Sequence, residues 1–136
     1  MCIRDSSTYH RFAVGMTGDK MSSSKPESTI FMDDEIESME RKVKRAISGG
    51  QPTVEEHRRL GGDVSKDVAF QYLQFFFEND DRALAEVKSE YESGRMLAGE
   101  VKQICIDRAT DWLIDLKQRR DQMEDSVADF LAPDAI

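Results

Sequence analysis

A short segment near the N-terminus, residues 20–24, combines the groups that bind phosphate. Glycines precede it at Gly15 and Gly18, and Lys25-Pro26 follows it. A flexible loop of this kind offers hydroxyls and backbone N–H groups as donors and lysines as point charges. It can hold a polyphosphate and stabilise the charge that develops on a pyrophosphate leaving group. Composition alone also allows a serine-rich linker with incidental lysines. The candidate residues are Lys20, Met21, Ser22, Ser23 and Ser24.

A second candidate region is a positively charged stretch in an acidic chain. The 136 residues carry a net charge of −8, but residues 41–59 contain six basic and two acidic side chains. Lysines and arginines can neutralise nucleic-acid phosphates, so this stretch is the candidate nucleic-acid face. A solvated helix surface with internal ion pairs is the alternative interpretation. The basic residues are Arg41, Lys42, Lys44, Arg45, Arg58 and Arg59.

The elements that position these residues are expected to be mainly α-helical. Asp33 or Asp34 is the predicted N-cap of a helix that runs to about Ile47, and Thr53 that of a short second helix. The pattern of apolar residues and caps predicts a helical bundle, preceded by a loop over residues 15–25 and a strand or extended entry over Tyr9–Val14. The further helices are predicted at about 66–78, 81–92 and 97–131, with Asn79 or Asp80 as the cap of the helix over 81–92.

Several conspicuous side chains are interpreted as structural. Cys105 and Trp112 lie on the apolar stripe of the last predicted helix, and His57 is interpreted as a surface or supporting histidine rather than a catalyst. The helix over residues 66–78 is apolar nearly all round, which predicts the buried centre of the bundle. Its aromatic residues, all expected in the core, are Phe70, Tyr72, Phe75, Phe76 and Phe77.

Composition also excludes several classes of protein. The sequence has no run of 18 or more apolar residues, so we expect no membrane span, and it shows no secretory signal. Its two cysteines, Cys2 and Cys105, form no disulfide framework. No metal-ligand spacing and no Ser/His/Asp order is recognisable, so no metal site is predicted. A cytoplasmic location is the default expectation.

An ordered series of motifs resembles one known family. Lys20–Ser24 matches four of the five positions of the Lys-Met-Ser-Lys-Ser signature of class I aminoacyl-tRNA synthetases, with Ser23 in place of the second lysine. The flanking motifs resemble the tryptophanyl branch of archaeal and eukaryotic type, and the series covers about residues 8–132. These motifs are Tyr9-His10-Arg11-Phe12, Met16-Thr17-Gly18, Lys25-Pro26-Glu27-Ser28, Ser48-Gly49-Gly50, Glu55-Glu56-His57-Arg58, Gly61-Gly62 and Gly99-Glu100.

The resemblance implies an ATP-dependent activation of tryptophan and its transfer to tRNA(Trp). It implies that Lys20 has the catalytic role and that Lys20, Ser22, Ser23 and Ser24 contact the phosphates of ATP bound with Mg²⁺. Met21, within the same ATP-binding segment, is expected to anchor the loop against protein, and tRNA is expected to be read by the helices. The resemblance divides the chain into a lead-in at 1–7, the end of a Rossmann-type catalytic domain at 8–32 and a helical anticodon-binding domain at 33–136. The implied tRNA contacts are Arg45, Gln51, Arg58 and Arg59.

The sequence also lacks the second signature of that family. No His-x-Gly-His element is present, so we expect the C-terminal part of such an enzyme, which forms a homodimer through the catalytic domain that is missing here. The isolated chain is expected to make no adenylate. Gln51-Pro52 departs from the basic and acidic pair that many family members carry at this point. A non-catalytic helical module that binds RNA or protein, and the tyrosyl branch of the same class, are the alternatives.

Overall fold

The computed structural model describes residues 12–123 and residue 126, and in this part it contains five α-helices and no strand. The prediction of a mainly α fold is therefore confirmed. Residues 12–14 of the predicted strand form none, and residues 9–11 lie outside the described part. The helices are α1 (Ile36–Arg45), α2 (Val54–Leu60), α3 (Val68–Tyr72), α4 (Asp81–Glu92) and α5 (Ala98–Met123), with a 3₁₀ turn η1 (Pro26–Ser28) and a π-helical turn η2 (Leu73–Phe77).

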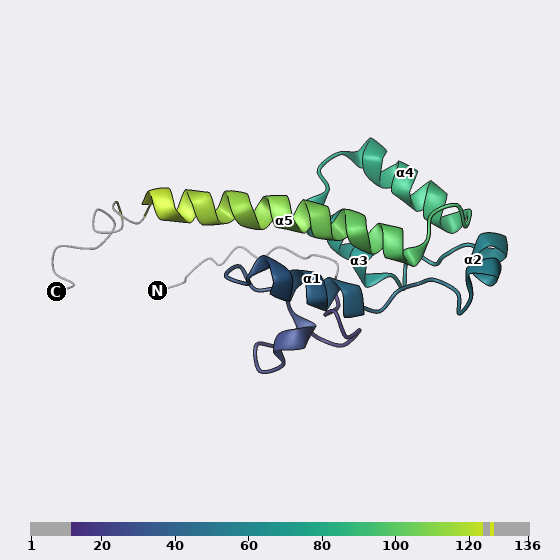
Figure 1. Ribbon diagram of the computed structural model, residues 1–136, viewed down its shortest axis with the longest axis horizontal. Helices are drawn as coiled ribbons and strands as arrows, with labels where there is room; N and C mark the ends of the chain where they lie inside the picture. The colour runs from purple at the N-terminus through teal and green to yellow at the C-terminus, as the bar shows by residue number, and fades with distance from the viewer. Residues whose placement is uncertain (1–11, 124–125, 127–136) are drawn as a thin grey trace, which may run out of the picture.

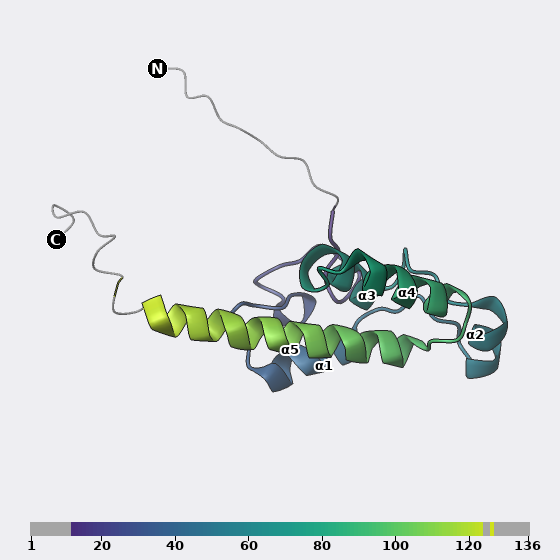
Figure 2. The same ribbon diagram turned by 90° about the horizontal axis from the view of Figure 1, so that it is seen from above.

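Helix α5 is the long element on which α1, α3 and α4 pack (Figure 1). It contacts α1, α3, η2 and α4, while α2 lies beyond its N-terminal end in both views (Figure 2). None of the helices in the described part combines the length and apolarity that a membrane span requires. The predicted continuation of α5 over residues 124–131 falls outside the described residues, apart from residue 126. The buried face of α5 consists of Val101, Cys105, Ile106, Ala109 and Leu113.

Helix α1 begins later than predicted because Asp34, a predicted N-cap, forms an ion pair with Lys42 instead. Glu35 occupies the N-cap position without a side-chain cap bond. Asp34 instead accepts a hydrogen bond from the Phe31 N–H at 2.9 Å and pairs with Lys42 Nζ at 2.6 Å. Lys42 is only 3% exposed and also donates to the Thr29 carbonyl at 2.9 Å. A buried ammonium needs such partners, so the expected N-cap serves as its counter-charge.

Helix α1 also ends before the predicted Ile47. Ala46 adopts an extended conformation with φ −58° and ψ 149°. Lys102 on α5 donates from Nζ to the carbonyls of Lys44 at 2.9 Å and Ala46 at 2.7 Å. A lysine that reaches the last carbonyls satisfies acceptors that the helix leaves free. The end of α1 is therefore set by α5 rather than by the following glycines.

The predicted caps of α2 and α4 are confirmed. The Glu56 N–H donates to Thr53 Oγ1 at 3.2 Å, and the Arg82 N–H donates to Asp80 Oδ1 at 2.8 Å. Gly61 follows α2 with φ +75°, a conformation that glycine adopts without steric cost.

A buried carboxylate joins α3 to two distant segments. Asp67 is fully buried and is the N-cap of α3, where Oδ1 accepts the Phe70 N–H at 2.9 Å. Its Oδ2 accepts the Gly49 N–H at 3.0 Å and the Tyr91 hydroxyl at 2.8 Å. Three donors from three parts of the chain therefore meet at one side chain, which offsets the cost of its burial.

The aromatic segment after α3 is less buried than predicted. The sequence predicts one helix over residues 66–78, but α3 changes at Leu73 into the π-helical turn η2. In this turn the Glu78 N–H donates to the Leu73 carbonyl at 2.9 Å. This wider turn rotates the side chains that follow away from the core face. Phe70 and Tyr72 are buried as expected, but Phe76 is 49% exposed. Phe75 and Phe77 are half-buried, and Phe77 packs against the core. The expected core position was therefore wrong for Phe75 and Phe76 and correct only in part for Phe77.

Two tyrosines provide a test of the Asp67 junction. Tyr91 donates its hydroxyl to a buried carboxylate, so Tyr91→Phe should lower the free energy of unfolding by about 1.5–3 kcal/mol. The hydroxyl of Tyr72 is buried without a hydrogen-bond partner among the described residues. Tyr72→Phe should therefore leave stability unchanged or raise it. Urea denaturation of both variants measures the difference, and equal losses would contradict a special role for Asp67.

Candidate functional site

The candidate phosphate loop has a base that is closed by backbone hydrogen bonds. The Met16 N–H donates to the Ser28 carbonyl at 2.9 Å, which joins the two ends of the loop. Inside it, the Gly15 N–H donates to the Asp19 carbonyl at 2.6 Å, and Gly18 has φ +84°. Met16 is 1% exposed and belongs to the hydrophobic core. The loop is thus attached firmly at its base.

Ser28 holds the middle of the loop from within. It is 1% exposed, and its Oγ accepts the Ser22 N–H at 3.1 Å and donates to the Lys25 carbonyl at 2.7 Å. Ser28 belongs to the Lys25–Ser28 motif, but the sequence predicts no role for it because its burial is visible only in three dimensions. Its hydroxyl sets the curvature of the segment that carries Ser22 to Ser24.

The outer rim of the loop carries uncommitted cationic groups. Lys20 and Lys25 are exposed, and neither has an ion pair within the described residues. The Oγ atoms of Ser22 and Ser24 lie 2.8 Å apart in a hydrogen bond. The rim encloses an open depression of about 450 Å³ that is lined by Asp19, Lys20, Met21, Ser22, Ser23 and Lys25.

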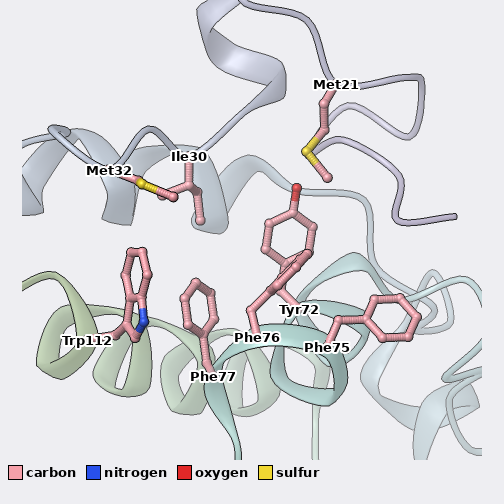
Figure 3. A pocket seen from close by; sticks show the side chains of 8 residues that line it. All are labelled: Met21, Ile30, Met32, Tyr72, Phe75, Phe76, Phe77 and Trp112. Atoms are coloured by element: carbon pink, nitrogen blue, oxygen red, sulfur yellow. The ribbon is translucent and has the colours of Figure 1, made fainter. Parts of the chain in front are cut away.

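Met21 points the other way, toward the helices (Figure 3). Its side chain lies at an apolar pocket of about 340 Å³ beside the aromatic residues of α3, η2 and α5. The hydroxyl of Tyr72 is directed toward Met21, and burial raises the pKa of this hydroxyl to about 12. The side chain of Met21 therefore anchors the loop to the bundle. The pocket is lined by Met21, Ile30, Met32, Tyr72, Phe75, Phe76, Phe77 and Trp112.

Glu27 links the loop to α1. Its carboxylate lies 2.9 Å from Arg41 Nη2 and 3.9 Å from Arg45 Nη1. The hydrogen bond from Arg41 holds the pKa of Glu27 below its usual value. These two arginines therefore have an acidic neighbour, although both remain exposed.

The positive stretch does not form one continuous face. Its members on α1 and α2 lie on different parts of the molecule (Figure 1). Lys42 is buried, and Lys44 pairs with Glu40 at 3.0 Å. Arg58 donates to the carbonyls of Gly94, at 3.0 Å, and of Arg95. Arg59 is exposed, with no ion pair or side-chain hydrogen bond recorded in the described part of the chain. The expectation of a solvated face was wrong for Lys42.

The turn Ser48–Pro52 rests on a buried histidine. Gln51 donates from Nε2 to the Gly61 carbonyl at 3.1 Å and from its backbone N–H to His57 Nδ1 at 3.4 Å. His57 is 2% exposed, and its Nε2 lies 2.8 Å from the Met96 carbonyl. These partners require the proton on Nε2, so Nδ1 accepts. His57 is thus a buried structural histidine, not a surface one.

An open depression lies beside this turn. It measures about 260 Å³ and separates the turn from the first residues of α5. Gln51, a predicted tRNA contact, is half-buried at its edge. Arg45 and Arg59 do not line this depression, so the structure does not bring the four predicted tRNA contacts together. The lining residues are Ser48, Gly50, Gln51, Pro52, Thr53, Val54, His57, Leu97, Ala98 and Gly99.

Comparison with known proteins identifies the family of this chain. A family described as "tRNA synthetases class I (W and Y)" matches residues 3–113. The chain is 46% identical over 125 residues to the tryptophan–tRNA ligase of Saccharolobus solfataricus, with 90% of this chain and 33% of the relative covered. It is 45% identical over 116 residues to the cytoplasmic tryptophan–tRNA ligase of Mus musculus, with 84% of this chain and 24% of the relative covered.

A solved structure gives the same result for the fold. The crystal structure of tryptophanyl-tRNA synthetase from Aeropyrum pernix K1 matches with a TM-score of 0.87 at 32% identity, over 94% of this chain and 35% of that one. The chain belongs to the class I tRNA synthetases for tryptophan and tyrosine. Within them it is of the archaeal and eukaryotic tryptophanyl type, which sets the tyrosyl alternative aside. It spans about a third of the length of the first relatives it matches.

Removal of the Ser28 hydroxyl should loosen the loop. Ser28→Ala deletes the acceptor of the Ser22 N–H and the donor to the Lys25 carbonyl. Loss of a hydrogen bond worth about 1 kcal/mol should speed amide exchange of Ser22 by roughly fivefold. Hydrogen exchange followed by NMR measures this change. The matched control is Ser23→Ala, which removes an exposed hydroxyl and should leave the Ser22 rate unchanged. Unaltered exchange in Ser28→Ala would show that Ser28 does not shape the loop.

Proposed function

We propose that this chain supplies the ATP-phosphate loop and the tRNA-binding helices of a tryptophan–tRNA ligase. The complete enzyme would activate tryptophan with ATP and transfer it to tRNA(Trp) in the cytoplasm. The observation that carries the proposal is the open depression where two exposed lysines, which form no ion pair within the described part of the chain, meet the Ser22 and Ser23 hydroxyls. Membership in the tryptophanyl type supports the identity of the reaction.

In this proposal Lys20 is the catalytic residue. Its ammonium group lies on the rim of the depression, where it can pair with the phosphates and stabilise the charge that develops on pyrophosphate. Ser22 and Ser23 line the same depression and donate to phosphate oxygens, and Ser24 orients Ser22 through their hydrogen bond. Met21 contributes to ATP binding by anchoring the loop at the aromatic pocket. Ser23 supplies no charge at the position of the second signature lysine, and Lys25 stands close by to compensate.

Magnesium would arrive with the nucleotide. No cluster of three or more histidine, cysteine, aspartate or glutamate side chains that could hold a metal ion occurs among the described residues. Mg²⁺ prefers oxygen ligands and is commonly held by substrate phosphates with one or two carboxylates. The loop donors and lysines fit the remaining phosphate oxygens of such a complex.

The helices would bind tRNA. Arg45, Arg58 and Arg59 provide cationic groups on α1 and α2, and Gln51 provides an amide at the Ser48–Pro52 turn. Unpaired anticodon bases can be read on their edges by such polar groups. We propose that residues 8–32 end a Rossmann-type catalytic domain, that residues 33–136 form the anticodon-binding domain, and that the complete enzyme is a homodimer.

Loss of the Lys20 charge should weaken phosphate binding. Lys20→Ala should reduce the affinity of the chain for tripolyphosphate about tenfold, because a charge-assisted hydrogen bond is worth roughly 1.5–3 kcal/mol. Calorimetric titration measures the dissociation constants. Lys44→Ala is the matched control, since Lys44 is an exposed lysine away from the depression. Equal affinities of Lys20→Ala and the unsubstituted chain would refute the role of Lys20.

Binding of tRNA should be selective and sensitive to salt. The chain should retain tRNA(Trp) in preference to other tRNAs on filters, with an affinity that falls as salt rises. Arg59→Ala should weaken binding and reduce the salt slope by about one unit if Arg59 contacts a phosphate. The control Arg119→Ala alters an exposed arginine on α5 that pairs with Asp115. Absence of tRNA binding would favour the alternative of a non-catalytic module that binds protein.

A further inference from the structure

A short extended segment connects the phosphate loop directly to the Ser48–Pro52 turn. Its central residue, Ile47, donates its N–H to the Met16 carbonyl at 3.1 Å and accepts the Val68 N–H at 3.0 Å. Its side chain covers Gly18, where an added Cβ would collide with Ile47 Cδ1. Ile47 therefore holds the base of the phosphate loop through its backbone and its side chain together.

The other end of this segment is fixed just as firmly. The Gly49 N–H donates to Asp67 Oδ2 at 3.0 Å, and the Gly49 carbonyl accepts the Asp63 N–H at 2.8 Å. A Cβ at Gly49 would collide with the Asp63 carbonyl, so the two backbones are in direct contact. The turn that carries Gln51 starts at this point. Ile47, which contacts the base of the loop, lies four positions before Gln51, the candidate RNA contact, a span of at most about 14 Å.

Lys102 determines where this segment begins. Its ammonium group bonds the carbonyls of Lys44 and Ala46 and thereby ends α1. Because Ala46 leaves the helix at this point, Ile47 faces Met16 rather than continuing the helical turn. Burial lowers the pKa of Lys102, and the charge of Asp67 opposes this shift.

We propose that residues 46–49 couple RNA binding at the Ser48–Pro52 turn to phosphate binding at the Lys20–Ser24 loop, and that Lys102 is the positioning residue for this coupling. The inference rests on the proposed function, because it requires both ligands to bind where that function places them. The carbonyls of Ala46, Ile47 and Gly49 and the N–H groups of Ile47 and Gly49 all bond to residues outside the segment. A shift of the turn therefore moves Ile47 and with it Met16 and Gly18. RNA bound at the turn then changes the affinity of the loop for phosphate, and the reverse holds by linkage.

The test measures the mutual effect of two probes on the unsubstituted chain and its variants. Tripolyphosphate is titrated in the absence and presence of a saturating anticodon stem–loop of tRNA(Trp). The quantity compared is the ratio of the tripolyphosphate dissociation constants with and without RNA. In the unsubstituted chain the RNA should change the dissociation constant about fivefold or more. Lys102→Met keeps the aliphatic stem but loses the ammonium group, and it should reduce this ratio to below about twofold. Lys102→Arg, which can still donate to both carbonyls, should restore it.

A matched control and a second variant keep the outcome decisive. Lys117 lies on the same helix as Lys102 and pairs with Glu35 at the N-terminal end of α1. Lys117→Met removes that contact and should keep the full ratio. If Lys102→Met fails to fold in urea titrations, Ile47→Ala is measured instead, because Ile47 is 47% exposed and its loss uncovers Gly18. Ile47→Ala should also reduce the ratio to below about twofold.

The possible results separate this inference from the proposed function. Binding of both probes without mutual influence would overturn the coupling and leave the proposed function intact. A full ratio in Lys102→Met, or in Ile47→Ala where that variant replaces it, would also overturn the role of this segment. Failure of either probe to bind would overturn the proposed function itself, and the coupling with it.

Discussion

The arrangement of this molecule depends on the buried carboxylate of Asp67. It accepts donors from Gly49, Phe70 and Tyr91, which belong to the turn after α1, to α3 and to α4. A buried charge is tolerable only when all its partners are in place, so these three elements take their positions together. The turn that follows Gly49 and, through Ile47, the base of the phosphate loop are placed as a consequence.

The candidate site combines a fixed base with an exposed rim. Met16, Ser28 and Met21 attach the loop to the core and the aromatic pocket, whereas Lys20 and Lys25 extend into solvent. This division suits the nucleotide-binding role that we propose, because the anchors fix where the cations are presented without fixing the cations themselves.

Local signals in the sequence were sufficient for some features and failed for others. The caps at Thr53 and Asp80 were predicted because a side chain two or three residues from its partner leaves a readable pattern. The pairing of Asp34 with Lys42 was missed, because it joins side chains eight positions apart that meet only in the folded chain. The roles of Asp67, Ser28 and Lys102 arise mainly from contacts between distant segments or from burial, which no local pattern records. The candidate phosphate loop was proposed from its composition and motif, whereas its orientation required the positions of Met21 and Ser28.

The aromatic pocket gives the chain a natural optical probe. Trp112 is the only tryptophan in the sequence, and it lies in the same pocket as Met21, with its ring centroid 5.9 Å from that of Phe77. Movement of the loop would withdraw the Met21 thioether from this pocket and alter the polarity around the indole. Intrinsic fluorescence can therefore follow the position of the loop without a label, and a shift of the emission maximum would record its departure from the bundle.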